Sequence, residues 1–168
     1  MTATLKGSPY IVLTQFSGWL AQTAASTWIA SHEWVIPTVQ SIHIAAISVA
    51  LVSAFMIGFR VLGWIAPDQT LQQTAERFWP WLAGSLVVLL VTGALMVVGE
   101  PARELLAFSF WLKMCLVVVA TLLTWWAGRS EVKPLAIVTL IVWIGVIFLG
   151  RLIAYDHIWG SWSGSTKA

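Results

Sequence analysis

Residues 36–62 read IPTVQSIHIAAISVALVSAFMIGFRVL, and their only charged side chain, Arg60, stands near the end. The hydrocarbon core of a bilayer is roughly 30 Å thick and needs about 20 apolar residues in a helix. The stretch therefore predicts a transmembrane helix. Three further stretches of the same kind follow at 81–98, 105–126 and 135–155.

The whole chain is as apolar as these four stretches suggest. Of its 168 residues, 59% are hydrophobic and 10% are charged, and the mean hydropathy is +0.85. Soluble domains have about 25% charged residues. A chain of this size cannot bury so much apolar surface in its own interior, so lipid must cover the rest. The sequence predicts an all-α membrane protein with a bundle of four transmembrane helices, and the net charge of +2 speaks against nucleic acid as a partner.

The N-terminal segment differs from the four spans. Residues 9–30 carry no charge, yet they mix apolar side chains with Gln and Thr. This pattern predicts an amphipathic helix lying in the membrane interface, and the alternative is a marginal fifth span. We therefore expect an N-terminal segment at 1–33, a transmembrane bundle at 34–160 and a polar tail at 161–168.

The basic residues of the loops are unevenly distributed. The loops on one side hold Arg60, Arg77, Arg129 and Lys133, whereas the short loop on the other side holds Arg103. Because cytoplasmic loops carry an excess of Lys and Arg, we expect the first side to be cytoplasmic in a bacterial inner membrane. Both termini would then be extracytoplasmic.

Two histidines lie at a similar depth in the outer half of the bundle. His43 lies inside the first predicted span, and His157 follows the end of the last one. Neutral imidazoles on facing helices are common axial ligands of haem in helical bundles. The pair therefore predicts a haem b site, with His43 and His157 as the iron ligands.

Other polar residues at this depth suit the same cofactor. Haem propionates bind cations, and a quinone headgroup could use the same polar groups. The predicted cofactor-binding residues besides His43 are Arg103, Lys113, Arg151 and Tyr155. Glu100 belongs to the same outer turn as Arg103.

A stripe of small residues follows His43 on its helix face, formed by Ala46, Ala50, Ala54 and Gly58. Such a stripe leaves room for a flat macrocycle. It is also what close packing between membrane helices uses, and this is the commoner cause.

Each ionisable residue also has a simpler interpretation. Lys113 and Arg151 could extend to the outer headgroups. His43 could hydrogen-bond to a neighbouring helix, and His157 could be a solvated interfacial residue. His32 is expected to be a surface residue. The single cysteine, Cys115, lies in an apolar run and is expected to be a small buried hydrophobe.

Several short stretches together resemble a known family. They are Trp28-Ile29, residues 34–37, Ser41-Ile42-His43, Pro80-Trp81, Thr92-Gly93, residues 100–102, Lys113-Met114 and residues 150–155. In this combination the chain resembles a bacterial family of small four-helix integral membrane proteins of unknown function. The family's general organisation is similar to that of small b-type membrane cytochromes. The resemblance implies the fold and carries no activity with it.

Three functional hypotheses follow from the sequence. The leading one is a membrane electron-transfer subunit that binds haem b or a quinone near the outer leaflet and exchanges electrons with an extracytoplasmic redox partner. The second is a cofactor-free accessory or anchor subunit of a larger membrane complex. The third is a small-molecule binding or transport protein, although the sequence shows neither the inverted repeats nor the broken helices typical of transporters.

Overall fold

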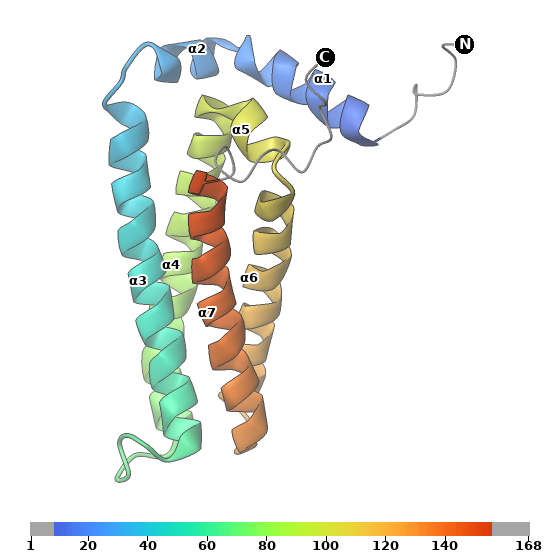
Figure 1. Ribbon diagram of the computed structural model, residues 1–168. Helices are drawn as coiled ribbons and strands as arrows, with labels where there is room; N and C mark the ends of the chain where they lie inside the picture. Colours follow the sequence, from blue (N-terminus) through green and yellow to red (C-terminus); the bar gives the residue numbers. More distant parts are fainter. Residues whose placement is uncertain (1–8, 156–168) are drawn as a thin grey trace, which may run out of the picture.

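The computed structural model describes residues 9–155, which form seven helices and no strand. Four of these helices are long and apolar enough to cross a membrane. They are α3 (Val35–Leu62), α4 (Leu71–Gly99), α6 (Phe108–Ala127) and α7 (Lys133–Tyr155). They run side by side as a bundle (Figure 1). The predicted all-α fold with four spans is therefore confirmed.

The second span begins earlier than predicted. Thr70 caps α4 with a capping box, in which its hydroxyl accepts a hydrogen bond from the Gln73 amide and the Gln73 side chain accepts one from the Thr70 amide. This cap starts the helix at Leu71, whereas the prediction began the span at residue 81. Pro80 lies inside α4.

A short helix that the sequence did not predict joins α4 to α6. It is α5 (Pro101–Leu105), with Pro101 at its first position, where the missing N–H costs nothing. The prediction had a tight turn at residues 99–101 followed by a span from residue 105. The third span instead begins at Phe108, because α5 and the residues after it take up the start of that stretch.

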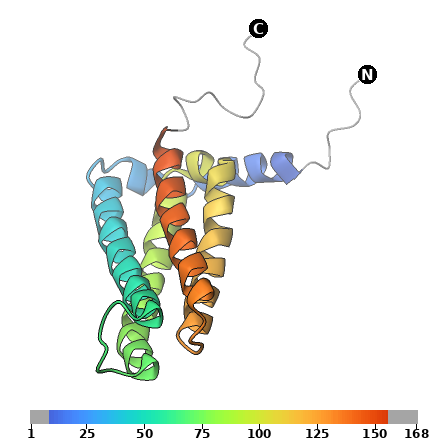
Figure 2. The same ribbon diagram turned by 60° about the horizontal axis from the view of Figure 1, so that its bottom comes forward.

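Two short helices lie across one end of the bundle, roughly perpendicular to the spans (Figures 1 and 2). They are α1 (Pro9–Ala21) and α2 (Ala24–Ala30), and the hydroxyl of Thr23 caps the second one by accepting a hydrogen bond from the Ser26 amide at 3.3 Å. The apolar part of α1, Ile11–Ala21, is too short to span a bilayer. Within the described residues this segment therefore lies across the end of the bundle (Figure 1) and adds no fifth span, and it forms two helices in place of the one predicted. We call this end, which also holds α5, the outer end, and the opposite one the inner end.

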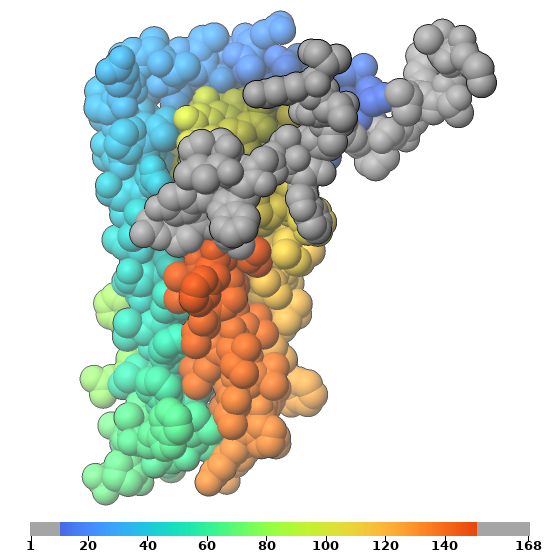
Figure 3. Space-filling model, viewed as in Figure 1, coloured from blue at the N-terminus to red at the C-terminus, as the bar shows by residue number. Residues whose placement is uncertain are grey.

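The bundle is built from two closely packed pairs, α3 with α4 and α6 with α7, and α3 also packs against α6 and α7. Ala50 and Ala54 of α3 are fully buried, and the indole of Trp143 from α7 fills the middle of the core beside them. Side chains of α3, α7 and α6 form one continuous face (Figure 3). The small-residue stripe is thus occupied by helix–helix packing, which was the simpler of its two interpretations.

The outward faces of the spans are apolar and exposed. Val87 and Leu90 of α4, Leu122 of α6 and Phe148 of α7 are each more than half exposed, and this surface must contact lipid. Cys115 is also exposed on α6, so its expected burial was wrong. The residues around Cys115 are apolar because this face of α6 contacts lipid.

Candidate functional site

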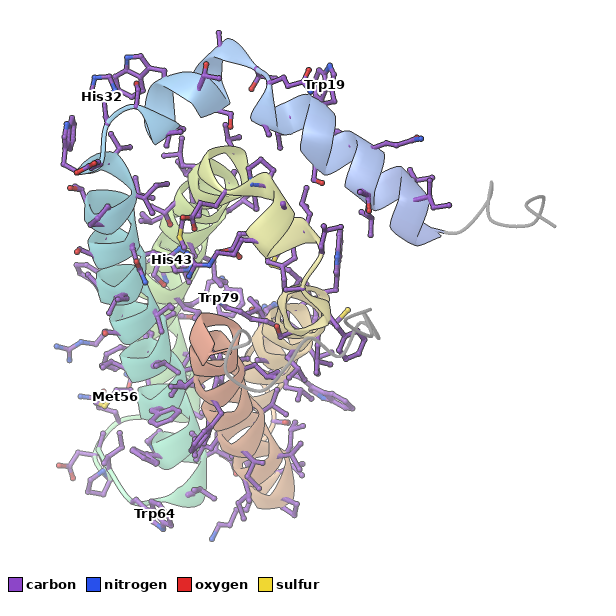
Figure 4. All side chains as sticks on the ribbon, turned by 45° about the horizontal axis from the view of Figure 1, so that its top comes forward. Trp19, His32, His43, Met56, Trp64 and Trp79 are labelled. Carbon is purple, nitrogen blue, oxygen red and sulfur yellow. The ribbon has the colours of Figure 1, made fainter. Side chains whose placement is uncertain are left out.

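His43 lies on the side of α3 that faces α4. Its Nδ1 atom is 2.7 Å from the hydroxyl oxygen of Thr92 on α4. Gly93, next to Thr92, faces the imidazole, and a Cβ there would be in ordinary van der Waals contact with the ring at 3.7 Å. Figure 4 shows His43 between these two helices, in the outer half of the bundle. The hydrogen bond between helices that the sequence offered as a simpler interpretation of His43 is present. This hydrogen bond uses Nδ1 and leaves Nε2, the other ring nitrogen of His43, free.

The hydrogen bonds of Thr92 define the tautomer of His43. The Thr92 hydroxyl oxygen is 2.7 Å from the carbonyl oxygen of Val88 and 2.7 Å from the imidazole Nδ1. The hydroxyl has one proton, and a carbonyl can only accept, so that proton must point to Val88. The contact with His43 then needs a proton on Nδ1. In the neutral imidazole Nε2 then carries the lone pair, which is the form of histidine that binds a metal or accepts a hydrogen bond.

Lys113 of α6 reaches the same region from the other side of the bundle. It is half-buried, and its Nζ lies 3.8 Å from the position that a Cβ on Gly150 of α7 would occupy. The ammonium is close enough to interact electrostatically with both His43 and Glu104. Within residues 9–155 it forms no ion pair and no hydrogen bond. A buried cation of this kind is available to an anionic or carbonyl group of a ligand.

Glu104 is the acidic member of the site, and the sequence interpretation missed it. It lies on α5 at the outer end and is only 7% exposed. Burial raises the pKa of Glu104 above its ordinary value, and the nearby cations Arg103 and Lys113 offset part of this effect. A carboxyl group with a raised pKa holds its proton more tightly than an ordinary carboxyl group does.

A hydroxyl group without a partner lies beside Lys113. Ser109 stands four residues before Lys113 on α6, on the same helix face. Its Oγ is the one buried side-chain oxygen or nitrogen of the described residues that has no hydrogen-bond partner. Buried hydroxyl groups are normally paired, so this atom indicates a place for a ligand atom or a water. We call His43, Thr92, Glu104, Ser109 and Lys113 together the His43 cluster.

The other predicted site residues are placed differently. Arg103 is exposed and forms an ion pair with Glu100 on the outer surface, so it does not point at His43. Arg151 and Tyr155 belong to the last turns of α7, directly after the Gly150 that Lys113 approaches. His157 lies outside the described residues. From the predicted set the structure brings together His43 and Lys113, and the side chains of Arg151 and Tyr155 lie outside what the structure describes.

Two cavities of the described residues lie away from this cluster. One of about 720 Å³ opens at the inner end, and an apolar one of about 570 Å³ lies between α2, α3 and α4. In the described part of the chain, no group of three or more His, Cys, Asp or Glu side chains could hold a metal ion.

Comparisons with known proteins add no constraint on function. The chain matches no protein-family model, no curated protein and no solved structure.

Proposed function

We propose that the protein is a membrane electron-transfer subunit whose cofactor, haem b or a quinone, binds at the His43 cluster. The cofactor would lie near the outer leaflet and exchange electrons with an extracytoplasmic redox partner. The observation that carries the proposal is the state of His43, because Thr92 holds its Nδ1 and the electron pair on Nε2 is free. Histidines that ligate metals donate their other ring N–H in this way.

The residues of the cluster fit a haem b in part. His43 Nε2 would be an axial ligand, and Lys113 would meet a propionate from α6. No second histidine lies near the site within residues 9–155. His32, for example, is held at the end of α2 by the Trp28 carbonyl at 2.8 Å. His157 remains the proposed second ligand. The bound haem would supply one-electron transfer. The chain would bind its iron through His43 and the charge of its propionate through Lys113.

A quinone is the second candidate, and the unpaired groups of the cluster favour it. Lys113 and Ser109 carry donors without acceptors in the described residues, and a quinone carbonyl is such an acceptor. Glu104 adds a buried carboxyl group with a raised pKa, which can take up a proton that quinol oxidation releases.

The competing hypothesis is a cofactor-free accessory or anchor subunit of a larger membrane complex. In that case the His43–Thr92 hydrogen bond would join α3 to α4, and a partner subunit would cover Glu104 and Lys113. A site at one end of the bundle cannot carry electrons across the whole bilayer. We therefore expect the protein to work beside a partner under both hypotheses.

One experiment separates the three cases. The protein is purified from its native membrane in mild detergent, its reduced-minus-oxidised visible spectrum is recorded, and a solvent extract is analysed for quinones. A Soret band with α and β bands in about one equivalent identifies haem b, and quinone in about one equivalent without these bands identifies the second candidate. If neither signal is found, the redox function is contradicted and the accessory-subunit hypothesis remains.

A further inference from the structure

A second site lies at the inner end, far from the His43 cluster. The cavity of about 720 Å³ opens between the first half of α4 and the last turns of α6. It exists because α4 and α6 both pack on α3 and make no extensive contact with each other in the described structure. Ile57 of α3 lies at its floor. The cavity is thus a gap between two spans at the level of one membrane surface.

Three charged side chains line this cavity, namely Glu76 of α4, Arg129 after α6 and Glu131. None of them forms an ion pair with another, since Arg103–Glu100 is the one ion pair in residues 9–155. Neutral neighbours hold two of them in place. The Arg129 guanidinium lies 3.9 Å above the Trp125 ring, and Glu76 accepts a hydrogen bond from Gln72 at 2.8 Å. One cation and two carboxylates therefore remain available to a ligand.

The polarity of the lining changes with depth. Trp79 and Pro80 line the cavity three and four residues after Glu76, which is about 5–6 Å farther into the bundle at 1.5 Å per residue. On the facing helix, Trp125 and Thr124 lie a similar distance from Arg129. A charged mouth thus leads to an aromatic and apolar interior. This gradient matches a lipid whose headgroup meets the charges and whose acyl chain begins beside the indoles.

We propose that this cavity binds a zwitterionic phospholipid with a primary amine, taken from the leaflet at the inner end. The phosphate would meet Arg129, and the ammonium group would lie between Glu76 and Glu131. Two features of the mouth set this preference. Its summed charge is negative, which disfavours an anionic lipid, and its two carboxylates need N–H donors, which a trimethylated amine lacks. The proposal does not depend on the cofactor at the outer end.

The test measures lipid binding to the purified full chain by native mass spectrometry. The protein is titrated with phosphatidylethanolamine, phosphatidylcholine or phosphatidylglycerol, with soluble phosphoethanolamine as a competitor. We expect phosphatidylethanolamine to bind about tenfold more tightly than phosphatidylcholine, as the loss of one charge-assisted hydrogen bond predicts. Equal binding of these two lipids, a preference for phosphatidylglycerol, or full displacement by the soluble headgroup would each overturn the proposal.

Variants of the three charges locate the site. The double variant Glu76→Gln, Glu131→Gln should lose the preference for the lipid with a primary amine. Arg129→Gln should weaken the binding of both zwitterionic lipids. Arg77→Gln is the matched control, because Arg77 is exposed on α4 and does not line the cavity. It should bind lipid as the unaltered protein does. If the double variant keeps the preference, the site is not this cavity, and melting temperatures check that every variant is folded.

Discussion

The Nδ1 atom of His43 and the hydroxyl oxygen of Thr92 lie 2.7 Å apart, which joins α3 to α4 in the outer half of the bundle. A second hydrogen bond of this kind, from Trp143 Nε1 to Thr124 Oγ1 at 2.9 Å, joins α7 to α6. These are the two side-chain hydrogen bonds between different spans in the described residues. Each closes one of the two tightly packed helix pairs, but only the first uses an ionisable side chain.

The role of Thr92 can be tested by two substitutions that separate its hydroxyl from its shape. Thr92→Val removes the acceptor for His43 Nδ1, whereas Thr92→Ser keeps it. We expect the valine variant to bind its cofactor about 10–100-fold more weakly, which is the usual effect of losing such a supporting hydrogen bond. Cofactor content after purification and titration with haem or quinone are the measurements. Equal loss in both variants would show that packing, and not the hydroxyl, matters at this position.

Glu104 gives the protein a predictable dependence of stability on pH. Because its folded pKa is raised, the folded state binds the proton more tightly than the unfolded chain does. This contribution to stability is complete below the ordinary carboxyl pKa and is lost as the pH rises through the raised value. We therefore expect the melting temperature in detergent to fall across that window, and Glu104→Gln to remove this part of the slope.

Glu33→Gln is the control for this measurement, because Glu33 is exposed and is not among the charged groups that act on Glu104. It should leave the Glu104-dependent fall in melting temperature in place. A Glu104→Gln variant that melts lower at neutral pH would mean that the ionised carboxylate stabilises the fold through Lys113, contrary to our expectation.

The hydrogen bond between Trp143 and Thr124 should make a measurable contribution to the packing of α6 on α7. Trp143 is 2% exposed and Thr124 is 1% exposed, so neither group can replace its partner with water. A double-mutant cycle of Trp143→Phe and Thr124→Ala should give a coupling energy of about 0.6–1.7 kcal/mol, the range typical within membrane proteins. The cycle is measured by unfolding in mixed micelles. A coupling energy of zero would mean that the two side chains contribute only through their volume.

The topology predicts on which side of the membrane a reporter protein fused to either terminus will lie. The four spans return the chain to the outer end, where α1 also lies (Figure 1). The inner end of the bundle holds four basic residues, Arg60, Arg77, Arg129 and Lys133, in its connections and in the adjoining helix ends. We expect a C-terminal alkaline phosphatase fusion to be active and a C-terminal green fluorescent protein fusion to be dark. The opposite pair of signals would place the inner end outside the cell.

The sequence was informative about the fold because lipid imposes simple rules on it. Long apolar runs such as residues 36–62 have few structural alternatives, and their number alone predicts the bundle. The predicted helix boundaries were wrong where local hydrogen bonding determines the start or end of a helix. The capping box at Thr70 begins α4 early, and Pro101 starts a short helix where a turn was expected. The amphipathic N-terminal segment divides in two because Thr23 can cap a new helix.

The site was less predictable, because its members come from four helices. His43 and Lys113 were found as ionisable residues inside spans, which is a strong signal in a membrane. Glu104 gave no such signal, because it lies in a polar connection and its burial depends on how α5 folds over the bundle. Thr92 looked like an ordinary helix residue. The available indication of the site was the Thr92-Gly93 pair, in which a residue with a hydroxyl group stands next to a residue without a side chain inside a span.

The central claim is that His43 holds a redox cofactor, and cofactor content in His43→Ala measures it most directly. His32→Ala is the matched control, because the hydrogen bonds of His32 go only to Ser31 and to the carbonyl of Trp28, four residues before it. Both variants and the unaltered protein are purified from the native membrane, and haem and quinone are quantified per chain. We predict about one equivalent in the unaltered protein and in His32→Ala, and none in His43→Ala. Equal cofactor content in all three proteins, or no cofactor in any of them, would contradict the claim.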